Sequence, residues 1–155
     1  MLIEEHHLAI LACDAGRERW NTVMVGPARY LVPARACDTD ESDQGVFVPG
    51  NVSNAELWAY DYEAADGPDS QSLKQISVID FPHADDFHTL GLAFDRETSK
   101  LFVTNHATAG SRIELFMLDV ASLTASYIQT IQHPLIHGPN GIALINGHEF
   151  YVTND

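Results

Sequence analysis

The sequence has little positive charge, and this limits the partners that it suits. Its 155 residues include 8 Lys and Arg against 22 Asp and Glu, which gives a formal net charge of −14. We therefore expect no binding to the phosphate backbone of nucleic acids, whereas cations such as calcium suit so acidic a chain. A solvated acidic surface explains most of these carboxylates equally well, because exposed Asp and Glu are the norm in proteins.

Cysteine is also scarce, and long apolar runs are missing. The two cysteines, Cys13 and Cys37, have neither a zinc-site spacing nor a CxxC motif. They fit a disulfide with each other, disulfides with partners outside this chain, or reduced thiols, so the sequence does not reveal the redox compartment.

No apolar run reaches the eighteen or so residues of a membrane span. Residues 1–7 lack the basic start and apolar stretch of a signal peptide, so we expect none, and the localisation stays unknown.

The short motifs of common catalytic sites are missing too. The sequence contains no GxSxG nucleophile elbow, no HExxH zinc motif, no P-loop and no GxGxxG fingerprint. No serine stands out as a nucleophile. If the chain is a hydrolase, the attacking group is therefore expected to be water rather than a side chain.

A passage that occurs twice is the most informative feature that is present. The strings LGLAF and LFVTNH lie within residues 90–106, and about fifty residues later NGIAL and FYVTND lie within residues 140–155. Residues 56–61 (ELWAYD) likewise resemble residues 114–119 (ELFMLD). Such a repeat of short alternating strands is typical of a β-propeller blade. Closed propellers have about four to eight blades, so we predict an all-β fold that is a portion of a propeller, about two to three blades.

Apolar runs separated by turn residues define the expected strands. We place strands at residues 7–13, within 17–24, and at 57–62, 73–81, 91–94, 100–104, 112–119, 125–132, 141–144 and 149–153. Helix signals are almost absent. Residues 25–54 contain three prolines and an acidic run without sustained periodicity, and an irregular insert of this length is uncommon in compact domains. We expect residues 1–155 to form one incomplete propeller domain with an irregular insert at about 25–54.

Polar pairs recur where the repeated strands begin and end, at residues 88–89, 105–106, 139–140 and 154–155. The inner strands of a propeller line its central channel, so side chains at equivalent strand ends are expected to converge. Asn140 and Asp155 offer the amide and carboxylate oxygens that calcium prefers, and they are our candidate metal ligands. Alternatively, these residues cap turns through their own backbones.

Two of the eight histidines occupy these repeated polar positions. His106 directly follows Asn105 at a strand end, and it is a candidate general base because imidazole gains and loses protons near neutral pH. His88 lies close to Asp85 and Asp86 in the sequence, which suggests a charge-tuned site. A hydrogen-bonding turn explains His106 equally well, and a solvated loop explains His88.

Taken in order, these segments resemble the paraoxonase/arylesterase family, in particular its fungal members. The resemblance depends on residues 91–92 (GL), 101–106 (LFVTNH), 113–116 (IELF), 130–135 (TIQHPL), 139–142 (PNGI) and 150–155 (FYVTND). It is good from about residue 57 to 155, fair over residues 3–24, and fails over residues 25–54. It implies a six-bladed β-propeller, calcium as cofactor, and hydrolysis of small aryl esters or lactones. Members of this family are often secreted.

The resemblance also implies roles for single residues. Asn140 matches an asparagine that binds the catalytic calcium of the family, and His106 matches one histidine of its proposed His-His dyad. The other dyad histidine falls at Leu90, and His88, two residues away, is our candidate substitute. Gly141 stands where the family has an aspartate that binds a second, structural calcium. The remaining calcium ligands of the family fall outside these 155 residues.

Three hypotheses follow from the sequence. The first is a calcium-dependent hydrolase of aryl esters or lactones, in which the ion polarises the carbonyl group and a histidine such as His106 activates water. The second is a non-catalytic interaction module, in which open strand edges pair with another chain or with a second copy. The third is a fragment that does not fold stably by itself. Calcium-dependent stability and ester hydrolysis discriminate the enzyme from the other two.

Overall fold

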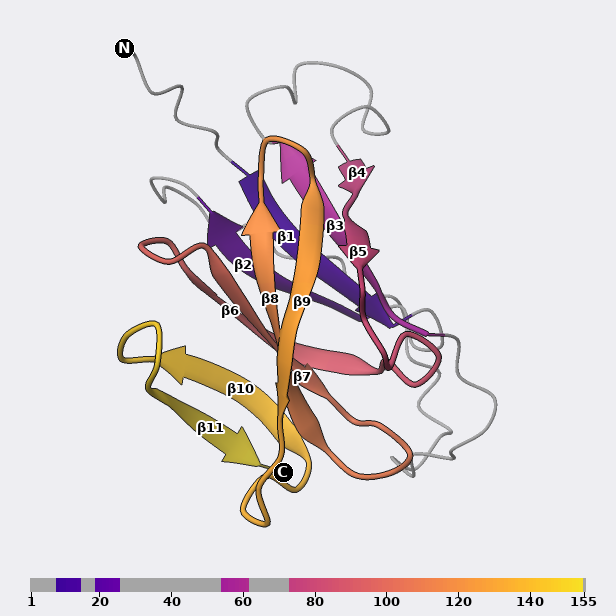
Figure 1. Ribbon diagram of the computed structural model, residues 1–155, viewed down its shortest axis with the longest axis vertical. Helices are drawn as coiled ribbons and strands as arrows, with labels where there is room; N and C mark the ends of the chain where they lie inside the picture. The colour runs from indigo at the N-terminus through magenta and orange to yellow at the C-terminus, as the bar shows by residue number, and fades with distance from the viewer. Residues whose placement is uncertain (1–7, 15–18, 26–53, 62–72, 155) are drawn as a thin grey trace.

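The structure, a computed structural model, describes residues 8–14, 19–25, 54–61 and 73–154. These residues form eleven β-strands and no helix. The strands make three sheets of four, five and two strands, which follow one another along the chain (Figure 1). The prediction of an all-β portion of a propeller is confirmed. The predicted insert falls almost wholly on residues 26–53, outside the described residues.

The first sheet contains the N-terminal strands and is antiparallel throughout. Its order is β2-β1-β3-β4, with β1 (Leu8–Asp14), β2 (Arg19–Val25), β3 (Glu56–Asp61) and β4 (Leu73–Gln75). In β3, Leu57 and Ala59 are buried whereas Glu56 is exposed. Successive side chains of a strand point to opposite faces, so this alternation turns one face of β3 towards the core.

The second sheet lies in the middle, and two of the four predicted site residues, His88 and His106, lie directly beside its strands. Its order is β5-β9-β8-β7-β6, with β5 (Ser77–Ile79), β6 (Thr89–Asp95), β7 (Lys100–Asn105), β8 (Arg112–Asp119) and β9 (Thr124–Ile131). The pairs from β6 to β9 are antiparallel, and β5 joins the edge parallel to β9. The predicted strands at residues 91–94, 100–104, 112–119 and 125–132 all lie within or beside these elements.

The single strand predicted for residues 73–81 is wrong, because the chain leaves one sheet for the next at Ile76. The Ile76 N–H donates to the Leu57 carbonyl of the first sheet, whereas the Ser77 N–H donates to the Leu123 carbonyl beside β9, both at 2.9 Å. Ile76 itself is buried in the core between these two sheets. Burial of this side chain places the crossing there, and a run of alternating residues does not reveal which sheet each half joins.

The third sheet pairs β10 (Pro139–Leu144) with β11 (Phe150–Asn154) in antiparallel fashion. Apolar side chains from the two faces of the middle sheet form two separate cores. One face packs against the first sheet through residues such as Leu101 and Phe116, and the other packs against β10 and β11 through residues such as Phe102. The Phe102 and Phe150 rings lie 5.4 Å apart between centroids. The middle sheet is therefore covered on both faces, as a blade is between its neighbours.

No helix in the part of the chain that the structure describes is long and apolar enough to cross a membrane.

Candidate active site

Strand β6 is the edge strand of the middle sheet and takes the place of the inner strand of a propeller blade. It begins with a bulge that a threonine side chain fills. The pairing of β6 with β7 shifts by one residue between Thr89 and Leu92. The hydroxyl of Thr104 accepts hydrogen bonds from the N–H groups of Leu90 at 3.2 Å and of Gly91 at 2.6 Å. The bulge thus leaves neither amide without a partner, although it interrupts the ladder.

Asn105, the next residue of β7, ties down the loop that leads into β6. Its Oδ1 accepts from the His88 N–H at 2.9 Å, and its Nδ2 donates to the Asp86 carbonyl and to Glu114 Oε1, both at 3.0 Å. The following residue, His106, donates its N–H to the His88 carbonyl at 2.8 Å. The main chain around His88 is therefore held on both sides by the end of β7.

The third sheet repeats this construction one blade later. The Thr153 hydroxyl accepts from the Gly141 N–H at 2.9 Å, at a bulge that again lies at the start of the inner strand. Asn154 Oδ1 accepts from the His137 N–H at 3.1 Å, and Asn154 Nδ2 donates to the Leu135 carbonyl at 2.9 Å. In both copies, the asparagine that ends the second strand ties down the loop that leads into the inner strand.

The inner strands β6 and β10 come together at this end of the molecule. A side chain on Gly91 would overlap with the carbonyl group of Asn140, so only glycine allows this approach of the two backbones. His106 reaches across the same junction, with its Nε2 at 2.8 Å from the Pro139 carbonyl oxygen. A carbonyl oxygen accepts only, so His106 carries its proton on Nε2 and its Nδ1 is the basic nitrogen.

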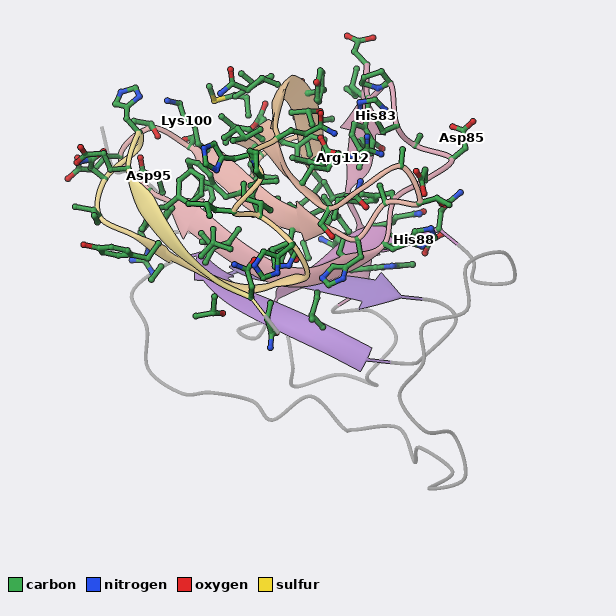
Figure 2. All side chains as sticks on the ribbon, turned by 90° about the horizontal axis from the view of Figure 1, so that it is seen from below. His83, Asp85, His88, Asp95, Lys100 and Arg112 are labelled. Atoms are coloured by element: carbon green, nitrogen blue, oxygen red, sulfur yellow. The ribbon has the colours of Figure 1, made fainter. Side chains whose placement is uncertain are left out.

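The structure thus brings together three of the four predicted site residues. His88 and His106 are half-buried, Asn140 is exposed, and all three lie where β6 and β10 begin and β7 ends. Asp155, the second predicted metal ligand, lies outside the described residues. In Figure 2, His88 lies at one end of the molecule, and Asp95 and Lys100, which flank the β6–β7 turn, lie at the other.

Asp86 faces His88 and is itself held by several donors. Its carboxylate accepts from the Thr108 N–H at 2.9 and 3.1 Å and from the Thr108 hydroxyl at 2.7 Å. Arg112 Nη2 lies 3.4 Å from Asp86 Oδ2, and His88 Nε2 lies 3.5 Å from Oδ1. Burial raises the pKa of Asp86, but the bonds from Thr108 and the charges of Arg112 and His88 together lower it below the usual 3.8.

A buried ion pair lies behind this loop, and sequence reasoning missed it. The side chain of Glu114 is fully buried, with the Nε of Arg112 at 3.0 Å from its Oε1. This N–H is not aligned for a hydrogen bond, so the pair is held by charge. The Thr130 hydroxyl donates to Glu114 Oε2 at 2.5 Å. The available signal was a glutamate between apolar residues near the start of the strand RIELFMLD, where burial demands a partner.

Comparison with known proteins identifies the family. The model of the family described as Arylesterase matches residues 57–155, which include both copies of the passage repeated at 90–106 and 140–155. The chain belongs to the arylesterase family. This confirms the family predicted from the sequence, while the likeness to its fungal members stays a prediction.

Several serum paraoxonases are similar to this arylesterase-family chain. Serum paraoxonase/lactonase 3 of Homo sapiens is 30% identical over 69 residues, which are 44% of this chain and 20% of the human protein. The Mus musculus protein of that name is 27% identical over 105 residues, 68% of this chain and 26% of the mouse protein. Serum paraoxonase/arylesterase 1 of Mus musculus is 36% identical over 58 residues, which are 37% of this chain and 16% of the mouse protein. The chain therefore spans about a quarter or less of the length of these relatives.

The described residues of this arylesterase-family chain do not form a metal site by themselves. They contain no group of three or more His, Cys, Asp or Glu side chains placed to hold a metal ion. Asn140, the predicted ligand, is an exposed residue, and calcium takes about six to eight oxygen ligands. The Nε2 of His106 is engaged with Pro139. A complete site needs ligands from outside the described residues.

Proposed function

We propose that this chain provides the base of a site that hydrolyses small carboxylic esters, namely aryl esters or lactones. The observation that supports the proposal is the hydrogen bond of His106 Nε2 to the Pro139 carbonyl, in a chain of the arylesterase family. That bond orients a half-buried imidazole beside the exposed Asn140. Activation of water without a side-chain nucleophile requires a general base that is held in a fixed orientation, and this imidazole meets that requirement.

In this mechanism His106 works through its Nδ1. The Pro139 carbonyl holds the proton of Nε2, so Nδ1 accepts a proton from water as the water oxygen bonds to the carbonyl carbon of the ester. The ester C–O bond then breaks, and the proton passes from Nδ1 to the leaving oxygen. An aryl ester gives a carboxylic acid and a phenol, and a lactone opens to a hydroxy acid.

Calcium is the cofactor of this proposal. Asn140 and Asp155 would be among its ligands, and a bound ion would supply Lewis-acid polarisation of the ester carbonyl. The contribution of the described residues is to place Asn140. Gly91 leaves space for the Asn140 main chain, and the positive φ of 80° at Gly138 turns the chain into β10 just before Pro139.

The test is hydrolysis of phenyl acetate and δ-valerolactone by the 155-residue chain, with calcium and with a chelator. We expect calcium-dependent turnover and a kcat about 10²- to 10⁴-fold lower in His106→Gln, the range typical of a lost general base. His148→Gln is the matched control, because His148 is exposed and lies in the turn between β10 and β11. Equal loss in both variants, or no turnover in either metal condition, would contradict the proposal.

A second function, association through a strand edge, is supported by a different observation. Among the described strands β11 pairs with β10 alone, and Tyr151 on this strand is 71% exposed. Open edges invite pairing with another strand. Light scattering across a concentration series tests this proposal, with dimers or larger species expected for the wild type and fewer for Tyr151→Lys. A monomer at all concentrations would exclude self-association.

A further inference from the structure

A continuous chain of hydrogen bonds links the fully buried carboxylate of Glu114 to the proposed base. Glu114 Oε1 accepts from Asn105 Nδ2 at 3.0 Å, and Asn105 Oδ1 accepts from the His88 N–H at 2.9 Å. The His88 carbonyl accepts from the His106 N–H at 2.8 Å, and the His106 ring bonds to the Pro139 carbonyl at 2.8 Å. This series of hydrogen bonds therefore runs from the interior of β8 to the first residue of β10.

Glu114, the buried end of this series of hydrogen bonds, is held by several contacts. Glu114 is paired with the charge of Arg112 at 3.0 Å, and its second oxygen accepts from the Thr130 hydroxyl at 2.5 Å. The hydroxyls of Thr130 and Tyr127 are in turn 2.9 Å apart. A buried carboxylate that is paired with a charge and accepts a hydrogen bond at each oxygen is costly to displace, because alternative positions leave its charge unpaired.

The repeat shows that tying the loop does not by itself require this carboxylate. Asn154 makes the same two bonds to its loop, to the His137 N–H and the Leu135 carbonyl. No carboxylate bonded to Asn154 occurs among the described residues. The additional link to Glu114 thus appears in the copy whose next residue is His106.

We propose that Glu114 is a positioning residue for His106, acting through the Asn105 side chain and the His88 main chain. Together with the Asp86 carbonyl, Glu114 fixes which way the Asn105 amide faces, since both groups accept only and must meet the Nδ2 group. The Oδ1 of Asn105 is then directed at the His88 N–H, and the His88 carbonyl holds the start of the His106 segment. The kinetic part of this inference rests on the proposed function, whereas the orientation of the ring does not.

Histidine side-chain NMR tests the orientation without any need for activity. In ¹⁵N-labelled chain, with the ring assigned through His106→Gln, we expect neutral His106 to carry its proton on Nε2. Glu114→Ala is expected to mix the two tautomers, whereas Glu114→Gln, whose amide oxygen still accepts from Asn105, is expected to keep one. Glu97→Ala is the matched control, because Glu97 is an exposed residue of the β6–β7 turn.

Thr130→Val provides a second variant that keeps the buried charge, in case loss of Glu114 unfolds the chain. It removes the hydrogen bond from the Thr130 hydroxyl to Glu114. We expect the tautomer population of His106 to change in the same direction as in Glu114→Ala, but by less. An unchanged His106 signature in Glu114→Ala, or in Thr130→Val where the first variant is unfolded, would overturn the inference.

Kinetics then separate this inference from the proposed function. Displacement of a base by a remote change lowers turnover by up to about 100-fold, so we expect kcat to fall about 10- to 100-fold in Glu114→Ala. KM should change less than twofold, and Glu114→Gln should restore most of the rate. A wild type that hydrolyses nothing refutes the proposed function, while the tautomer data still decide the positioning. A changed tautomer with unchanged kcat refutes the catalytic part of the inference.

Discussion

Gly91 lies where two inner strands meet, and its missing side chain sets the position of Asn140. A methyl group there would overlap with the Asn140 carbonyl, which belongs to the backbone and cannot rotate away. The repeat-related Gly141 is less confined, since a Cβ would meet the Thr153 hydroxyl at 3.2 Å, an atom of a side chain. The two glycines therefore have different reasons for being glycine, although they occupy the same place in the repeat.

Gly91→Ala is expected to lower the free energy of unfolding by about 1–3 kcal/mol, the usual cost of overpacking. Gly141→Ala should cost less, because the Thr153 side chain can shift. Urea denaturation of the two variants and the wild type measures both values. Equal losses, or a larger loss for Gly141→Ala, would show that β6 and β10 are not in the close contact described.

Asp86 makes stability depend on pH in acid. Its folded-state pKa is lowered below 3.8, so its ionised form stabilises the fold above that value. This stabilisation disappears as the pH falls through the lower, folded-state pKa, because both states then bind the proton. We expect unfolding free energy to decrease on acidification below about pH 4, and Asp86→Asn to flatten this decrease.

The exposed neighbour Asp85 provides the control for that measurement. Figure 2 shows the Asp85 side chain at the outer edge of the molecule, pointing away from the ribbon. Asp85→Asn should keep the acid slope of the wild type in urea denaturation between pH 3 and pH 7. If Asp86→Asn and Asp85→Asn give the same slope, the contacts of Asp86 with Thr108 and Arg112 do not account for the effect.

At the scale of elements, β7 and β11 each end in an asparagine that holds a loop in place, and the two asparagines differ in how deeply they are buried. Asn105 is fully buried and ties its loop with three bonds, one of them to Glu114, whereas Asn154 is exposed and makes two. A buried donor or acceptor that loses its partner costs about 1–3 kcal/mol, but water replaces the partner of an exposed group.

Asn105→Ala is therefore expected to lower the free energy of unfolding by about 1–3 kcal/mol, and Asn154→Ala by less than about 1 kcal/mol. Amide hydrogen exchange reports the local effect, with faster exchange expected at His88 in the first variant and at His137 in the second. Exchange that is unchanged at His88 in Asn105→Ala would show that this loop is held by other contacts.

The sequence predicted the elements better than their connections. The alternation of apolar residues and the repeat were sufficient for the all-β fold and for most strands. They were not sufficient at Ile76, where one apparent strand serves two sheets, because periodicity describes the faces of a strand and not its neighbours. The polar ends at 88–89, 105–106 and 139–140 were located correctly. The ties made by Asn105 and Glu114 were not predicted, since they join residues far apart in the sequence.

On the scale of the whole molecule, the middle sheet is a blade with a neighbour on each face. Its two cores contain different residues, with Phe116 facing the first sheet and Phe102 facing the third. This stacking aligns β6 and β10 so that their first residues lie together, and it is the reason that His88, His106 and Asn140 share one end. The net charge of −14 favours cations over anions as partners of the chain as a whole.

Calcium titration followed in ¹H–¹⁵N correlation spectra tests this convergence most directly. The account predicts that calcium shifts the amide signals of residues 88–89, 105–106 and 139–140 together, with one shared affinity, and that Asn140→Ala abolishes these shifts. Signals of the β6–β7 turn at the opposite end, near Asp95 and Lys100, should not move with that affinity. Shifts confined to exposed carboxylates, or separate affinities at His106 and Asn140, would contradict the claim that these residues form one site.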